Sequence, residues 1–136
     1  MVNDMTLEER KQKALEIRKQ GYNCAQTVLM VFASDLGLTE EQAATLTSGL
    51  GGGVGACGEL CGVPLAMAIA QSMICGPDPT KKARTYGEVR SLMEEFASRH
   101  NGCLRCRDLK SKPNVIPCNE LILNGMEILH KAVSKK

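Results

Sequence analysis

The chain has 136 residues, with 17 lysines and arginines against 15 aspartates and glutamates. A net charge of +2 does not favour nucleic acid or an anionic membrane as a partner, and two tyrosines and two phenylalanines offer few rings for stacking on bases. The length suits one domain over residues 1–136. The first ten residues are polar, and Gly62 and Pro64 interrupt the longest apolar stretch. We therefore expect no signal peptide, no membrane insertion and a cytoplasmic location.

Helix-start signals recur in the first third of the chain, and strand signals are scarce. Three pairs of residues have the spacing of a capping box: Thr6 with Glu9, Asn23 with Gln26, and Thr39 with Gln42. Gly21 and Gly37 are typical helix stops after the first two of these segments. The predicted helices cover residues 7–20, 24–36 and 40–46.

The remaining helices follow a glycine-rich segment, residues 48–58, which we expect to be a tight crossing between helices. The next helix, residues 61–75, is apolar on nearly every side and is predicted to be central and buried. Asp78 and Pro79 begin a long amphipathic helix that ends near residue 101. A short helical turn over residues 106–110 and a last helix from Cys118 complete an all-α fold of five or six helices.

Seven cysteines are the most informative feature of the sequence. In a reducing compartment, clustered cysteines indicate metal binding or thiol chemistry more often than disulfide bonds. Four of them stand where a helix is predicted to begin, and there free N–H groups and the helix dipole favour a thiolate. These four are Cys24, Cys61, Cys106 and Cys118. For Cys24, burial as a small apolar side chain is the alternative interpretation.

The other cysteines carry weaker signals. Cys103 and Cys106 form a C-x-x-C unit, which is common to thiol oxidoreductases, zinc sites and iron–sulfur ligands. Cys57 lies four residues before Cys61 and could serve as an extra ligand or a resolving thiol. Cys75 falls at a predicted helix C-terminus, where the dipole opposes a thiolate, and is interpreted as packing.

Two further features are interpreted as structural. The glycine run lacks the Lys-Ser/Thr pair of a phosphate-binding loop, so it is expected to bring backbone close to Cys61. His100 and His130 are expected at the surface rather than as ligands.

Four segments occur in the order of a known pattern: Asn23-Cys24-Ala25-Gln26, the glycine run into Gly58-Glu59-Leu60-Cys61-Gly62, Cys106-Arg107, and Cys118. Residues 21–129 thus resemble the C-GCAxxG-C-C family of redox-active proteins, small chains named for four spaced cysteines. The resemblance aligns the family cysteines with Cys24, Cys61, Cys106 and Cys118.

The central motif departs from the family pattern. In the segment Cys61-Gly62-Val63-Pro64-Leu65-Ala66, Val63 replaces the pattern's alanine and Ala66 its glycine. A shifted register, Cys57-Gly58-Glu59-Leu60-Cys61-Gly62, keeps the last glycine but places Glu59 at the alanine. We prefer the first register because it preserves the glycine run before the motif.

The resemblance implies redox or metal chemistry, and three hypotheses follow. In the first, Cys24, Cys61, Cys106 and Cys118 hold Zn²⁺ or an iron–sulfur cluster for electron transfer. Extra ligands would be Cys57 and Cys103, and the glycines beside the cofactor would be Gly51, Gly52, Gly53, Gly55, Gly58 and Gly62. The second hypothesis is metal-free thiol–disulfide exchange. The third is a non-enzymatic helical interaction module with buried cysteines.

The helix-start positions also predict where the sulfurs lie and how their pKa values shift. The four helix-start sulfurs should converge beside residues 51–55 and have pKa values below the ordinary ~8.5. Cys106, flanked by Arg105 and Arg107, should be the most reactive. Cys75 should have a raised pKa and stay inert. A redox protein is the expected partner, a homo-oligomer is compatible with the sequence, and no nucleic-acid partner is expected.

Overall fold

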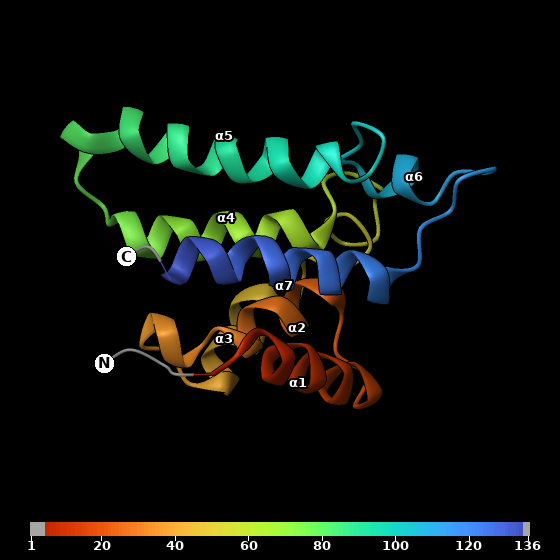
Figure 1. Cartoon of the computed structure of the whole chain (residues 1–136), viewed down its shortest axis with the longest axis horizontal. Coiled ribbons are helices and arrows are strands. Elements are labelled where there is room, and N and C mark those ends of the chain that lie inside the picture. Colours follow the sequence, from red (N-terminus) through yellow and green to blue (C-terminus); the bar gives the residue numbers. More distant parts are fainter. Residues whose placement is uncertain (1–4, 135–136) are drawn as a thin grey trace.

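The computed structural model describes residues 5–134, and every structural statement below concerns that part of the chain. It contains seven α-helices, two 3₁₀ turns and no sheet strand, which confirms the all-α class (Figure 1). None of these helices combines the length and apolar composition that a bilayer crossing requires. The elements in chain order are α1 (Leu7–Lys19), α2 (Cys24–Val31), η1 (Ser34–Leu36), α3 (Glu40–Thr47), α4 (Gly62–Cys75), η2 (Pro79–Lys81), α5 (Lys82–Ser98), α6 (Cys106–Leu109) and α7 (Cys118–Ser134).

The predicted capping boxes are present as reciprocal hydrogen bonds. Before α1, the Glu9 amide donates to Thr6 Oγ1 over 3.1 Å, and the Thr6 amide donates to Glu9 Oε1 over 2.8 Å. Asn23 and Gln26 make the same exchange before α2, and a third box precedes α3. Each box satisfies N–H groups that lack helical acceptors, so these three helices begin where the sequence predicts.

The predicted end of the second helix is wrong. We expected it to continue to Leu36, but α2 ends at Val31 and the chain turns through η1 to Gly37, whose φ is 74°. The turn is held against α1 by Asp35, whose two carboxylate oxygens accept from the Arg10 guanidinium, each over 2.9 Å. This ion pair joins residues far apart in the sequence, and the apolar pattern does not reveal it.

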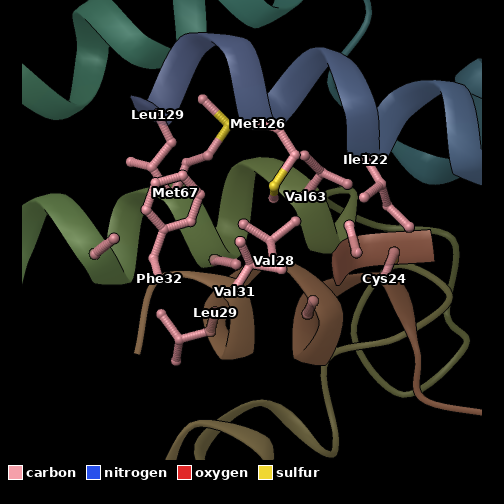
Figure 2. Close-up of a cluster of buried hydrophobic side chains, with 14 of the residues drawn as sticks. Cys24, Val28, Leu29, Val31, Phe32, Val63, Met67, Ile122, Met126 and Leu129 are labelled. Carbon is pink, nitrogen blue, oxygen red and sulfur yellow. The ribbon is translucent and has the colours of Figure 1, made fainter. Parts of the chain in front are cut away.

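The helix α4 lies at the centre of the fold, as predicted. Figure 1 shows it alongside α5 and α7, with α2 beneath, and it packs on all three. The core is aliphatic apart from two phenylalanines, and Figure 2 shows Phe32, Met67 and Met126 within one buried cluster. Because three helices pack on α4, the core holds this helix in place.

A buried arginine joins α1, η1 and α7. Arg10 is only 2% exposed, and its Nε donates to His130 Nδ1 over 3.0 Å. Its guanidinium carbon also lies 4.2 Å from the centre of the Phe32 ring. Buried charges need such partners to offset lost hydration, so this network is a fixed structural element of the fold.

The expectation that both histidines lie at the surface is wrong for His100. Its side chain is 1% exposed, with Nδ1 2.6 Å from the Phe96 carbonyl oxygen and Nε2 2.9 Å from Asn124 Nδ2. Burial lowers the pKa of His100, because the charged imidazolium would lose its hydration there. The neutral ring therefore serves as a hydrogen-bonded connection between α5 and α7.

Candidate functional site

The glycine-rich segment forms a left-handed turn. All five residues 52–56 have positive φ values, between 59° and 79°. Hydrogen bonds close the turn, including Gly58 N to Gly52 O at 3.0 Å. Glycine adopts this backbone at little cost, whereas Val54 and Ala56 each carry about 1–2 kcal/mol of strain. The expected tight crossing is therefore present, with a handedness that the sequence did not reveal.

The turn lies against the starts of α2 and α6, the start of α4 lies against α2, and glycine is required at each contact. A Cβ on Gly51 would stand 2.8 Å from Asn23 Cβ, and one on Gly53 would stand 2.8 Å from Cys106 Cβ. A Cβ on Gly62 would stand 2.7 Å from Cys24 Sγ. The remaining predicted glycines differ: Gly52 faces Ala56 of its own turn, Gly58 faces Arg107, and Gly55 has open space around it.

A short antiparallel pairing fixes α6 beside the start of α4. Leu60 and Arg105 form an isolated bridge, and the Cys61 amide donates to the Leu104 carbonyl over 2.9 Å. The Arg107 amide donates to the Gly58 carbonyl over 3.2 Å. These backbone bonds bring the C-x-x-C segment next to the central motif.

Cys24 and Cys61 form a buried, hydrogen-bonded pair. Cys24 is the first residue of α2 and is 8% exposed, while Cys61 caps α4 and is 3% exposed. The Cys61 thiol donates to the Cys24 thiolate, and this bond is the largest influence lowering the pKa of Cys24 to about 6. Figure 2 shows Cys24 at one end of the buried cluster. The interaction therefore favours a thiolate at Cys24 and a protonated thiol at Cys61.

Backbone donors complete the surroundings of the Cys24 sulfur. The amides of Ala25 and Gly62, at the starts of α2 and α4, stabilise the thiolate, and the positive charge of Arg18 adds to the effect. Burial acts in the opposite direction and exceeds the effect of either amide, but the interaction with Cys61 outweighs it. The pKa of Cys61 is raised, because its proton is held by the Cys24 sulfur and its side chain is buried.

Cys106 and Cys118 are half-buried and belong to the same electrostatic group. Burial is the main cause that raises the pKa of Cys106, and negative charges on Cys118 and Cys24 raise it further. A charge on Cys106 also contributes to the raised pKa of Cys61. Charges on the other helix-start cysteines thus oppose the ionisation of Cys61 and Cys106.

The prediction of a lowered pKa at all four helix starts is wrong for Cys61 and Cys106. Burial and neighbouring thiolates oppose ionisation there, and α6 has only four residues to provide a dipole. The expected help from Arg105 and Arg107 is also absent from the causes that shift the pKa of Cys106. Both guanidiniums instead bind Glu59, at 3.2 and 3.1 Å.

A comparison with protein-family models matches residues 22–132 to the family described as "Putative redox-active protein (C_GCAxxG_C_C)". The chain belongs to this C_GCAxxG_C_C family. Searches of curated proteins and of solved structures each gave no match. The family assignment therefore rests on the matched residues, which include all four helix-start cysteines.

The structure favours the first of the two registers for the C_GCAxxG_C_C motif. Cys61 lies against Cys24, whereas Cys57 is exposed, its thiol 3.7 Å from the Gly55 carbonyl oxygen. Val63, which replaces the pattern's alanine, is accommodated by Gly125 of α7, where any Cβ would collide with Val63 Cγ1. A glycine inside a helix is a recognisable signal of close packing, so Gly125 could have been identified from the sequence.

The thiols of Cys103 and Cys75 have other neighbours than the Cys24–Cys61 pair. Cys103 is half-buried, its thiol 3.7 Å from the Asn101 carbonyl oxygen, and Cys75 is half-buried at the other end of α4. Sequence reasoning missed the role of Glu59, whose partners follow it by more than forty residues. Within residues 5–134, no three His, Cys, Asp or Glu side chains are grouped so that they could hold a metal ion.

Proposed function

We propose that the protein is a thiol–disulfide redox protein whose reacting pair is Cys24 and Cys61. The observation that carries this proposal is the burial of Cys24 and Cys61 beside each other at the starts of α2 and α4, where Cys61 lowers the pKa of Cys24. A depressed pKa makes a cysteine nucleophilic near neutral pH, and a thiol beside it can resolve the product. Cys24 is the attacking residue and Cys61 the resolving residue.

The exchange proceeds in two steps and oxidises the pair by two electrons. The Cys24 thiolate attacks one sulfur of a disulfide R–S–S–R′, forms a mixed disulfide Cys24–S–S–R, and releases R′–S⁻. Cys61 passes its proton to the departing thiolate, attacks Cys24 Sγ, and releases R–S⁻. The products are the Cys24–Cys61 disulfide and two reduced thiols, one protonated and one ionised, and the reverse steps reduce the pair.

The surroundings of the pair support this assignment of roles. The amides of Ala25 and Gly62 stabilise negative charge on Cys24 Sγ, which favours Cys24 as the attacking thiolate. Cys61 is the more buried of the two and keeps its proton until the mixed disulfide forms. A redox protein in a reducing compartment such as the cytoplasm would be the natural source of electrons.

A second candidate function is metal or iron–sulfur binding by Cys24, Cys61, Cys106 and Cys118 for electron transfer. The supporting observation is that charges on Cys24 and Cys118 raise the pKa of Cys106, and a charge on Cys106 raises that of Cys61, a conflict that a bound cation would relieve. The donor chemistry fits Zn²⁺ or a cluster. The arrangement of the four cysteines does not fit a metal site, because no three His, Cys, Asp or Glu side chains in residues 5–134 are grouped so that they could hold a metal ion. We therefore place this candidate second.

Anaerobic purification, a visible spectrum and metal analysis separate the two candidates. The exchange proposal expects colourless, metal-free protein that forms one Cys24–Cys61 disulfide when titrated with a small disulfide, located by peptide mass spectrometry. Cys61→Ala should stop at a mixed disulfide on Cys24, and Cys57→Ser, which removes an exposed thiol, should behave as wild type. Visible charge-transfer bands or about one bound zinc per chain would favour the second candidate. Absence of any Cys24–Cys61 disulfide would overturn the first.

A further inference from the structure

A second thiol, far along α4 from the first pair, lies on a cavity. The cavity has a volume of about 320 Å³, is open to solvent, and is lined by residues of α4, α5 and α7. Cys75, the last residue of α4, lines it together with Gln71 one turn earlier. This volume is within the range of small-molecule sites, which begins near 300 Å³.

Gln71 presents an unused acceptor to this cavity. The side chain is 6% exposed, and its Nε2 donates to Cys75 Sγ over 3.4 Å. Every fully buried side-chain nitrogen or oxygen in residues 5–134 has a partner, whereas Gln71 Oε1 has none. The oxygen is therefore open to the cavity that Gln71 lines, and a donor on a ligand would satisfy it.

The α5 wall of the cavity carries one free charge of each sign. Arg84 and Glu88 are one helical turn apart, both are exposed, and neither makes an ion pair within residues 5–134. Further along α5, Glu95 is paired with Lys131 of α7 at 2.7 Å and with Arg99 at 3.2 Å. The floor is apolar, formed by side chains that include Leu92 and Ile128. A ligand would thus meet a cation, an anion and a thiol at separate points.

The C-terminal ends of α4 and α7 add a negative potential at the same place. Cys75 and Ala132, which lie in the last turns of these helices, both line the cavity. The carbonyl ends of helices favour positive groups such as an ammonium. The acceptor oxygen of Gln71 and the Glu88 carboxylate point to the same preference.

We propose that this cavity binds amino-acid disulfides, molecules that carry an α-ammonium, an α-carboxylate and a disulfide, and that Cys75 forms a mixed disulfide with them. Arg84 binds the carboxylate, while Glu88 and Gln71 Oε1 bind the ammonium. The Cys75 thiol loses its proton to solvent against the helix dipole, which the bound ammonium offsets, and its thiolate attacks the ligand disulfide, forms Cys75–S–S–R, and releases R–S⁻. The site is separate from Cys24 and Cys61 and does not depend on the exchange proposed for them.

The test measures mixed-disulfide formation at Cys75 with four probes at about pH 8, where an ordinary thiol is partly ionised. The probes are cystine, cystamine with ammonium groups only, dithiodiglycolate with carboxylates only, and hydroxyethyl disulfide with neither. Each rate at Cys75 is divided by the rate at the exposed Cys57 in the same sample, which corrects for the intrinsic reactivity of the probe. We expect this ratio to be about tenfold higher for cystine than for hydroxyethyl disulfide, from charge-assisted hydrogen bonds.

Substitutions on α5 then assign the charges. Arg84→Gln should remove the advantage of cystine over cystamine, and Glu88→Gln its advantage over dithiodiglycolate. Arg90→Gln and Glu94→Gln are matched controls, because both residues are exposed on α5 outside the cavity lining. Equal ratios for all four probes, or equal effects of Arg84→Gln and Arg90→Gln, would overturn the proposal. Peptide mass spectrometry reads Cys24 and Cys61 separately, so this outcome leaves the exchange proposal intact.

Discussion

The two ends of α4 carry the same functional group in different surroundings. At the N-terminal end, Cys61 is 3% exposed and donates its proton to the Cys24 thiolate. At the C-terminal end, Cys75 is half-buried, accepts from Gln71, and faces a cavity with free charges. The first arrangement suits internal disulfide formation, and the second suits a ligand from solution.

The difference shows that position on a helix does not by itself set the chemistry of a cysteine. Cys61 lies at a helix N-terminus, where the dipole favours a thiolate, yet its pKa is raised. The proton shared with Cys24 and the burial of the side chain outweigh the dipole. The nearest hydrogen-bond partner is therefore the stronger influence, and it can be removed by substitution.

The largest expected effect concerns the ionisation of Cys24. With a pKa of about 6, about 90% of Cys24 is thiolate at pH 7, against about 3% for an ordinary cysteine, a ratio of about 30. Cys24→Ala should abolish the rise in thiolate absorbance near pH 6 when the protein is titrated with base. Cys61→Ala should move it to higher pH because the strongest donor is lost, and Cys75→Ala should leave it unchanged. An unchanged titration in Cys61→Ala would show that the two thiols are not paired.

The second expected effect is a pH-dependent stability of the reduced protein. Above pH 6 the folded protein has released the Cys24 proton, while the unfolded chain keeps it until about pH 8.5. Stability should therefore rise with pH in this window, by up to about 1.4 kcal/mol per pH unit. Above about pH 8.5 the unfolded chain has lost the protons of both Cys24 and Cys61. The folded protein still keeps the Cys61 proton there, so stability should fall again.

Urea unfolding of the wild type and of Cys24→Ala, at pH values from 6 to 10 in the presence of a reductant, measures this effect. The rise should vanish in the variant, and the fall should remain because Cys61 is still buried. The lowered pKa of His100 adds a loss of stability as pH falls below its ordinary value of ~6.5, but it acts alike in both proteins. Parallel curves for the two proteins across the whole range would contradict the assignment of the thiolate to Cys24.

The third expected effect tests how closely α4 approaches α2. A methyl group on Gly62 would stand 2.7 Å from Cys24 Sγ and 3.1 Å from the Ala25 amide nitrogen. Gly62→Ala should therefore destabilise the protein by about 1–3 kcal/mol and disturb the Cys24 thiolate. Gly87→Ala in α5 is the control, because that glycine has nothing within 4 Å, and it should stabilise by about 0.5–1 kcal/mol. Chemical denaturation of both variants decides whether close packing at position 62 is real.

Features set by neighbouring residues were predictable from the sequence, and features set by distant ones were not. The starts of α1, α2 and α3 follow from capping pairs three residues apart, and the structure has them. The end of α2 depends on the bond between Asp35 and Arg10, which are 25 positions apart. No periodicity carries that information, so the predicted helix was too long.

The same division holds for the candidate site. Its four cysteines were recognised by their order and spacing, and the family match covers them. The direction of the pKa shifts at Cys61 and Cys106 was not predictable, because it depends on which thiolates face each other after folding. The cavity at Cys75 was also missed, since it combines single residues from α4, α5 and α7.

The smallest expected effect concerns Glu59, which binds Arg105 and Arg107 at the N-terminal end of α4. All three side chains are about half exposed, and exposed ion pairs contribute less than about 1 kcal/mol because solvent screens them. Glu59→Gln should therefore change the urea midpoint little and leave the titration of Cys24 as in wild type. The backbone bonds from Cys61 to Leu104 and from Arg107 to Gly58 would still hold α6 in place. A large loss of stability, or a shift in the Cys24 titration, would mean that side-chain charges rather than the backbone pairing position α6 and the N-terminal end of α4.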